Sequence, residues 1–227
     1  MRKALVHLVC VAVLGMVAAV AQEHQHDAAP AKLAEAKAPA KEVKPPADWK
    51  LRLDKPLAPG KDPLSFVEMA PGWHVTTSSS AAIRYHPARM AKGYFTVESE
   101  MFLFSTEHLH EGYGVIIGGR DLEGPAQAYI YFLLRGDGQF IVKRRAGDVT
   151  ETLVPWTPSA AILAMKPDAN VKNAIKVVVG AETVDFYANG EKLTSLPRKD
   201  IIADGIVGLR INHGINIHVS SLKLDGT

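Results

Sequence analysis

Glu98 and Glu100 stand two residues apart in the segment GYFTVESEMFLF, which begins at Gly93. Alternate side chains of a β-strand share one face, so both carboxylates would lie on the same side, with Cα atoms roughly 6.5 to 7 Å apart. Their side chains can then approach the separation of about 5 to 5.5 Å that retaining glycosidases use. The adjacent carboxylate and Phe102 would raise the pKa of a general acid here. The pair predicts either a catalytic centre or two solvated glutamates matched by cations on the next strand.

Polar side chains also recur at alternate positions near the C-terminus. Arg210 and Asn212 share a face in GLRIN, and Asn216 and His218 share one in INIHV. Carbohydrate hydroxyls would satisfy such groups, so we interpret Arg210, Asn212 and His218 as ligand contacts. The alternative interpretation is structural, with Arg210 paired with one of the two glutamates across the sheet.

Two tyrosines, Tyr129 and Tyr131, alternate in AYIYF ahead of a hairpin turn. If that turn consists of the two residues Asp137 and Gly138, Arg144 shares the face of the tyrosines. Tyrosine rings can stack on the apolar side of a sugar while an arginine binds its hydroxyls. The same three residues can instead form a cross-strand aromatic and cation cluster that holds the sheet together.

Arg120 and Asp121 follow two glycines in IIGGRDL, where the strand must end. This places both residues at a loop rim. A rim position suits ligand contact, and it suits a local ion pair equally well.

The N-terminal region predicts one metal site. Cleavage after Ala21 would leave Gln22-Glu23-His24 at the mature N-terminus, and a histidine in third position favours square-planar Cu(II) or Ni(II). Cyclisation of Gln22 would block that site. We find no aspartate-rich calcium loop in the sequence and expect no other cofactor.

Residues 1–48 divide into two segments that precede the expected folded domain. Arg2 and Lys3 lead into an apolar run that ends in Ala19-Val20-Ala21, so we interpret residues 1–21 as a cleaved signal peptide. The run is shorter than the about 20 residues of a membrane span. Residues 22–48 are rich in alanine, proline and lysine and resemble a flexible linker, which leaves one domain at 49–227. The chain is expected to be exported, to the periplasm or outside the cell.

Net charge restricts the partners. The chain has 26 basic and 24 acidic residues, and loss of Arg2 and Lys3 with the signal would balance them. A neutral chain has little long-range attraction for phosphate, so neither nucleic acid nor an anionic membrane surface is an expected partner.

The domain reads as β-structure almost throughout. The stretch 111–145 contains runs rich in β-branched and aromatic residues, and Asn189-Gly190 is a strong hairpin signal between two alternating segments. In the Gly93 segment, Phe95, Val97 and Met101 fall on one predicted core face. Only ILAMK and LPRKDI could form a helical turn. About ten short strands with almost no helix predict an all-β, two-sheet antiparallel sandwich.

The order EGYGVIIGGRDL, AYIYFLLRGDGQFIVKRRAGD, NAIKVVVGAETVDFYANGEKL and DGIVGLRINHGINIHVSSLKL resembles the concanavalin A-like lectin/glucanase superfamily. The resemblance covers Trp73 to Leu224 and is greatest to secreted bacterial domains of the laminin-G-like and 3-keto-disaccharide hydrolase type. It implies a jelly roll of two curved sheets, with ligands on the concave face or its loop rim. Glycosidases of the superfamily carry three alternating carboxylates on one strand, and this chain offers only Glu98 and Glu100.

Three functions are compatible with these observations. The first is a non-catalytic module that binds a glycan or a cell-envelope component. The second is a glycoside hydrolase, or an enzyme similar to the 3-keto-disaccharide hydrolases, that uses Glu98 and Glu100. The third is a structural envelope protein.

Overall fold

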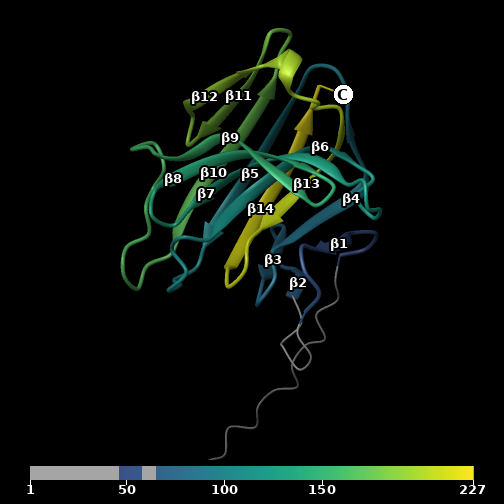
Figure 1. The fold of residues 1–227 in the computed structure, drawn as a ribbon. Helices are drawn as coiled ribbons and strands as arrows, with labels where there is room; N and C mark the ends of the chain where they lie inside the picture. The colour runs from purple at the N-terminus through teal and green to yellow at the C-terminus, as the bar shows by residue number, and fades with distance from the viewer. Residues whose placement is uncertain (1–45, 58–64, 227) are drawn as a thin grey trace, which may run out of the picture. The chain divides into compact units, whose positions relative to one another are not determined.

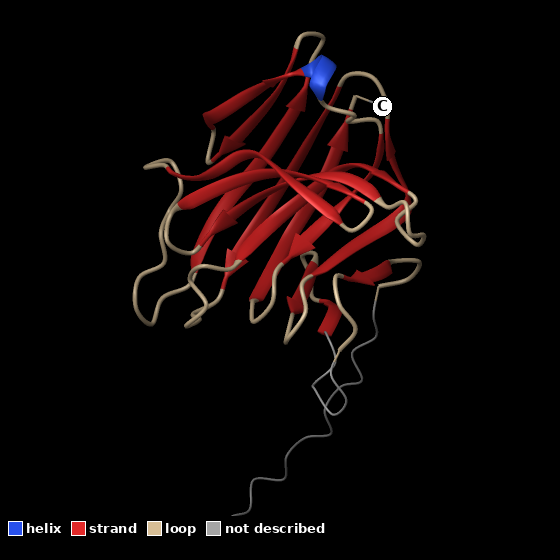
Figure 2. Ribbon diagram, viewed as in Figure 1, coloured by secondary structure: helices blue, strands red, loops and turns tan. Residues whose placement is uncertain are grey.

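The computed structural model describes residues 46–57 and 65–226. Within them it contains fourteen strands and one short 3-10 turn, η1 (Arg198–Asp200), so the predicted all-β class is confirmed (Figures 1 and 2). The turn lies in LPRKDI as predicted, whereas ILAMK forms no helix. The predicted signal peptide, most of the linker and His24 lie outside the described residues.

Seven strands form the first sheet, here called sheet A, and every neighbouring pair in it is antiparallel. Across the sheet the order is β1 (Lys50–Leu53), β4 (Ala82–Ala91), β13 (Gly205–Ile211), β6 (Gly112–Arg120), β7 (Ala128–Arg135), β8 (Gln139–Ala146) and β9 (Val149–Pro158).

The second sheet, sheet B, is also antiparallel and has seven strands. Its order is β12 (Glu191–Pro197), β11 (Thr183–Ala188), β10 (Val171–Val179), β5 (Phe95–Leu103), β14 (Asn216–Asp225), β3 (Trp73–Thr76) and β2 (Ser65–Glu68). Within the described residues, no helix is long and apolar enough to cross a bilayer.

The core lies between the two sheets and follows the alternation of the strands. Strand β5 alternates buried and half-buried residues along its whole length, which confirms the face predicted from Phe95, Val97 and Met101. The side chains of Val97 and Met101 are fully buried, and they join residues of β6, β7 and β13 in one cluster. A face of β-branched and aromatic residues therefore holds the sheets together by burial of apolar surface.

The hairpin between β11 and β12 determines which of their side chains stand opposite one another. Asn189 and Gly190 form the two-residue turn that the sequence predicts, with Tyr187 opposite Lys192. A register shift between Phe186 and Tyr187 places Phe186 opposite Thr194, whereas an unbroken two-residue hairpin would have paired it with Leu193. In a sheet, one extra residue changes every partner beyond it.

Candidate functional site

The predicted site residues separate into three places. Arg120, Asp121, Tyr129 and Arg144 meet at one end of sheet A, with Tyr131 and Arg210 alongside them on two of its strands. Asn212 follows the opposite end of β13, where its amide donates to the carbonyl of Gly112 at the start of β6. His218, Glu98 and Glu100 lie on sheet B.

Arg120 reaches the rim because two glycines precede it. Gly118 has a φ of +66°, and a Cβ there would lie 2.2 Å from the carbonyl oxygen of Ile202. The register of β6 with β7 shifts between Ile117 and Arg120, which marks a bulge. The glycine pair thus lets the segment after η1 pack directly on the backbone of β6, and the strand ends with Arg120 exposed beside it.

Asp121 stabilises the loop that follows β6. Its carboxylate accepts a hydrogen bond from the amide of Ala126 at 2.9 Å, and its carbonyl accepts one from Gly124 at 3.0 Å. Its positive φ of 47° suits a residue whose side chain binds nearby backbone. These contacts give Asp121 a structural role in the β6–β7 loop (residues 121–127), and its carboxylate makes no ion pair with Arg120 among the described residues.

Arg210, Tyr129 and Tyr131 form a buried network on the outer face of sheet A. The guanidinium binds both oxygens of Asp54 at 2.7 and 2.5 Å and donates to the Tyr129 hydroxyl at 3.2 Å. It also lies 5.2 Å from the ring centroid of Tyr131. Arg210 therefore pairs with Asp54 and not with either glutamate of sheet B, which corrects the pairing considered from sequence.

The electrostatics of this network follow from its burial. Arg210 and Tyr129 are 6% and 2% exposed. Burial alone would lower the pKa of Arg210, but the hydrogen bond from Arg210 to Asp54 and the charge of that carboxylate raise it, so the guanidinium stays protonated. Burial disfavours the charged form of Tyr129 as well, and so it raises the pKa of that hydroxyl. The tyrosines act as neutral partners of one fixed cation.

The β6–β7 loop lies across the same face. Leu122 is 3% exposed and belongs to an apolar cluster with Tyr85, Tyr129 and Tyr131. Arg52 on β1 donates to the carbonyl oxygens of Leu122 at 3.0 Å and of Gly124 at 2.8 Å. The central part of the face is therefore covered by the chain itself, and the open surface lies at its end.

Three predicted residues, Arg120, Tyr129 and Arg144, line one pocket of about 310 Å³. We call it the basic pocket, because its lining also includes Arg145 and Lys199. It lies between the ends of β6, β7 and β8 and the turn η1. The residues that could contact a ligand directly thus come from four separate parts of the chain.

The predicted relation between Arg144 and the tyrosines is wrong in register. Leu134 opposes Phe140, so the turn has one residue more than the two-residue form. Arg145 therefore stands opposite Tyr129, and Lys143, not Arg144, stands opposite Tyr131. Arg144 stands opposite Ile130 and reaches the pocket from the other side. It binds Glu151 at 2.9 Å and donates to the carbonyl oxygen of Asp200.

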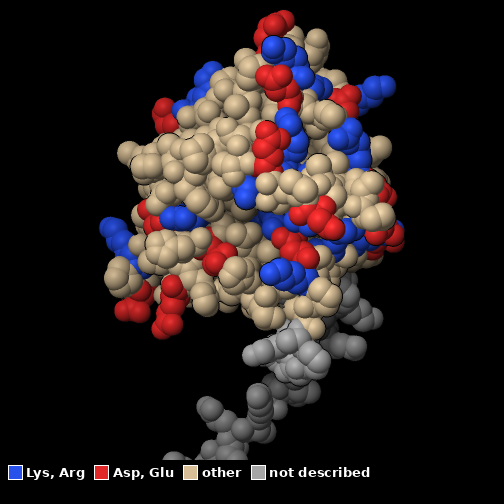
Figure 3. All heavy atoms as spheres, in the orientation of Figure 1, with Lys and Arg blue, Asp and Glu red and all other residues tan. Residues whose placement is uncertain are grey.

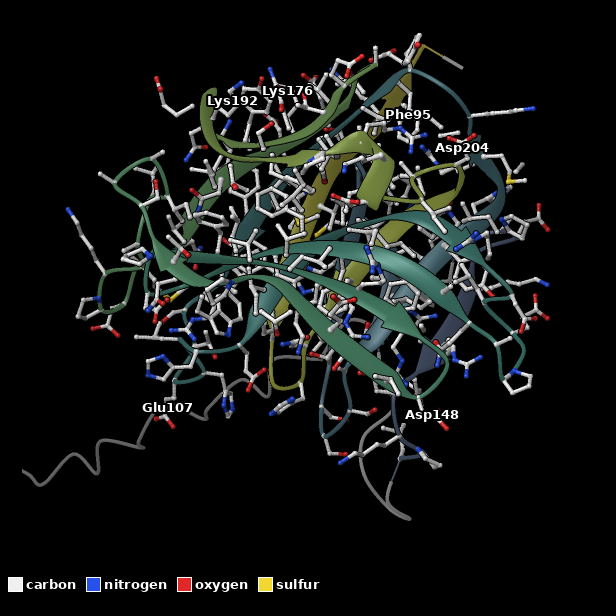
Figure 4. The ribbon with its side chains drawn as sticks, turned by 45° about the horizontal axis from the view of Figure 1, so that its top comes forward. Phe95, Glu107, Asp148, Lys176, Lys192 and Asp204 are labelled. Atoms are coloured by element: carbon white, nitrogen blue, oxygen red, sulfur yellow. The ribbon has the colours of Figure 1, made fainter. Side chains whose placement is uncertain are left out.

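A second pocket adjoins the basic pocket and shares Arg120 with it. This apolar pocket has a volume of about 660 Å³ and is lined by Met90, Ala91, Gly119, Asp204 and Ile206, among others. Met90 is 60% exposed at the edge of this pocket. In Figure 4, Asp204 and Glu107 lie on opposite sides of the domain, so the loop before β6 is remote from this site.

Glu98 and Glu100 lie on the outer face of sheet B, where they line a groove of about 460 Å³. Glu100 forms an ion pair with Lys172 at 3.3 Å. Glu98 stands opposite Lys176 on one side and Lys223 on the other. The two carboxylates therefore occupy a face rich in lysine, and the cations on the next strand that the sequence suggested are present beside an open groove.

His218 also lies on the outer face of sheet B, opposite His74 on β3. Its ring centroid lies 6.1 Å from that of Phe102, and both side chains line a shallow apolar pocket. Burial and the nearby His218 lower the pKa of His74, so the His74 ring favours the neutral form. Among the described residues no group of three or more histidine, cysteine, aspartate or glutamate side chains could hold a metal.

Asp54, Arg145 and Lys199 belong to the site but were not singled out from sequence. Arg145 was one residue from the predicted position, and the length of the hairpin turn decided between the two. Asp54 and Lys199 lie in segments without alternation of polar and apolar residues. They are also far along the chain from Arg210 and Arg120, so no local sequence pattern predicts that they lie near these residues.

The comparisons with known proteins concern the fold. No family model matches the chain, and no curated protein of similar sequence was found. Carbohydrate binding module CBM66 from Bacillus subtilis superposes with a TM-score of 0.56 at 7% identity, covering 79% of this chain and 96% of its own. A Bacillus subtilis protein of unknown function with a galectin-like fold gives 0.56 at 9% identity, covering 78% and 88%. A GH16 protein of the Bacteroides ovatus mixed linkage glucan PUL gives 0.55 at 11% identity, covering 81% and 97%. The domain has the concanavalin A-like sandwich fold that the sequence order predicts.

Proposed function

We propose that the domain binds carbohydrate without catalysis, and that the basic pocket is where it does so. The observation that carries this proposal is the meeting of Arg120, Tyr129 and Arg144 in one pocket at the rim of sheet A. Loop rims on a rigid sheet are where binding residues concentrate, because the sheet fixes their positions while the ends remain accessible.

The chemistry of the pocket supports this use. Arginine and lysine donate several hydrogen bonds each, which suits the many acceptor oxygens of a sugar. Exposed Ile202 offers an apolar surface for the C–H side of a ring. Solved proteins with this fold include a module whose name describes carbohydrate binding, which favours the same use here.

A glycan array with the purified protein tests the proposal, and Ala146→Trp serves as the blocking variant. Ala146 is exposed and lines the basic pocket, so a large ring there fills the binding space without disturbing the core. We expect the wild type to retain a defined set of glycans and the variant to lose them, with the thermal unfolding midpoint unchanged. Wild-type binding that Ala146→Trp leaves intact would place the site elsewhere, and no binding to any glycan would remove the function.

The groove beside Glu98 and Glu100 favours a second candidate, a glycoside hydrolase, because it holds paired carboxylates in an open cleft. A hydrolysis screen with wild type, Glu98→Gln and Glu100→Gln tests it. Turnover that either variant abolishes would establish the enzyme. Glycan retention without turnover would leave the binding module.

Export remains part of the proposal: a short linker after a cleaved signal would display the domain beyond the cytoplasm. Mass spectrometry of the mature N-terminus tests the predicted cut after Ala21 and shows whether Gln22 is cyclised. Copper titration of an open N-terminus then tests the His24 site, and the absence of a d–d band would end that prediction.

A further inference from the structure

Four cationic side chains line the basic pocket, namely those of Arg120, Arg144, Arg145 and Lys199. The lining includes one carboxylate, that of Asp200. Positive groups gathered around a concave surface strengthen one another's attraction for an anion. The pocket is thus a local positive site, although the whole chain carries a formal charge of only +2.

Two of the four cations are already engaged. Arg144 binds Glu151 at 2.9 Å, and Arg145 donates to the carbonyl oxygen of Gly147 at 2.6 Å. In the described part of the chain, Arg120 and Lys199 have neither a hydrogen-bond nor an ion-pair partner, and both are exposed. The donors left for a ligand are therefore one guanidinium and one ammonium group.

These donors select the chemistry of the ligand. A guanidinium matches the two oxygens of a carboxylate or a sulfate in a bidentate geometry, while an ammonium acts as a point charge. The apolar pocket continues from Arg120 on the other side, with Met90 and Ile206 in its lining beside Lys92, Asp121 and Asp204. A ligand that spans both pockets needs an anionic group near Arg120 and an uncharged sugar face beyond it.

We infer that this rim binds an acidic polysaccharide, whose carboxylate or sulfate ester is held by Arg120 and Lys199. The inference rests on the proposed carbohydrate-binding function and specifies its ligand class. Charges of both signs intermingle on the molecular face shown in Figure 3, so the expected recognition is local and not the result of a uniformly positive surface.

Matched polymers isolate the anionic group. Affinity electrophoresis compares polygalacturonate with its fully methyl-esterified form, and dextran sulfate with dextran, so the members of each pair share a sugar backbone and differ in the presence of an anionic group. We expect retention by one or both charged polymers, at least about tenfold weaker binding of the neutral partner, and a fall in affinity as salt rises. Carboxylate and sulfate are distinguished by which charged polymer is retained.

Arg120→Gln and Lys199→Gln test the two donors. Lys166→Gln is the control, since it makes the same charge change at an exposed residue of the loop between β9 and β10, away from both candidate sites. We expect about tenfold weaker binding for Arg120→Gln and about threefold weaker binding for Lys199→Gln, with the affinity of the control unchanged. Arg120→Lys should recover only part of the affinity, because the bidentate contact is lost.

Three outcomes would overturn the inference. Equal binding of charged and neutral partners would show a sugar-binding site without charge selection and would leave the proposed function standing. Equal losses in Lys166→Gln and Arg120→Gln would show unspecific ion exchange. Failure to retain any of the four polymers, together with a silent glycan array, would remove the proposed function and this inference with it.

Discussion

At the scale of single residues, the pair of buried Arg210 and half-buried Asp54 organises one face of sheet A. The guanidinium is fixed by two oxygens of Asp54, by the Tyr129 hydroxyl and by the ring of Tyr131. An isolated buried charge is costly, so each partner depends on the other. The pair therefore contributes to stability only while both groups are charged.

Asp54→Asn leaves the Arg210 charge without its counter-ion, and we expect a loss of about 3 kcal/mol in the free energy of unfolding at pH 7. Burial opposes the charge of Asp54, but the hydrogen bond and charge of Arg210 lower the pKa of Asp54 below its ordinary value of 3.8. The wild type therefore has this contribution above about pH 4 and loses it as the pH falls through the lower, folded-state pKa.

Urea unfolding at pH 7 and at steps below pH 4 measures both effects. The stability of the variant should fall less steeply with acid than that of the wild type. Asp148→Asn is the control, since its carboxylate is fully exposed and 3.8 Å from Arg145, and it should leave the curves unchanged. Parallel acid profiles for wild type and Asp54→Asn would contradict the pairing.

The sequence could predict the types of residue at the site but not all their partners. Arg210 and the two tyrosines were recognised because they alternate with core residues on their strands. Asp54 was not, because it follows a four-residue edge strand and meets Arg210 only through the pairing of β1 with β4 and of β4 with β13. Contacts of that kind depend on sheet order, which alternation does not specify.

At the scale of elements, the bulge at the end of β6 determines where the rim lies. Gly118 combines a positive φ with a close approach of the Ile202 carbonyl. Strands β6 and β7 and the segment after η1 converge there. A change in the backbone at Gly118 would therefore shift Arg120 and both pockets together.

Gly118→Ala should lower the free energy of unfolding by about 3 kcal/mol, since it adds a steric clash to the strain of a positive φ. Gly93→Ala provides the matched control. Gly93 has a φ of +75°, and no atom lies within 4 Å of the place that an added methyl group would take, so strain alone should cost about 1 kcal/mol. Thermal and urea unfolding give both values, and equal losses would show that the close approach does not matter.

The β6–β7 loop gives a second prediction at this scale. Arg52→Ala removes two hydrogen bonds to the loop carbonyls of Leu122 and Gly124 and should cost about 1 to 2 kcal/mol. Hydrogen exchange of the amides between 121 and 127 should become faster. Lys50→Ala, which loses only an exposed pair with Glu123, should change exchange less. Unchanged exchange in Arg52→Ala would mean that packing of Leu122 alone holds the loop.

Elements were predicted well where the local signal was strong. The alternation of β5 and the Asn189-Gly190 turn are both present as expected. The turn before β8 was expected to be one residue shorter. The extra residue moves Arg144 from the face of the tyrosines to a position opposite Ile130 and places Arg145 opposite Tyr129. Several glycines in one turn allow more than one length, so the sequence pattern does not decide the register.

At the scale of the whole molecule, the basic and acidic residues nearly balance. The protein should therefore bind anions at the basic pocket and have no general affinity for polyanions. With 26 basic and 24 acidic residues, the chain should not retain duplex DNA at physiological salt. A gel shift measures this directly, with the charged polymer that the protein retains as the positive comparison. Strong DNA binding would show that the cations act collectively and not through one pocket.

The edge strands of both sheets affect how the protein behaves at high concentration. The outermost strands are β1 and β9 in sheet A and β12 and β2 in sheet B. Strands β1 and β2 have only four residues each, β9 carries Pro155 and Pro158, and β12 carries Lys192 and ends at Pro197. Short strands, prolines and lysines at an edge hinder the addition of a strand from another molecule. A fold made almost wholly of β-strands is thereby protected against amyloid-like aggregation by the residues at its four borders.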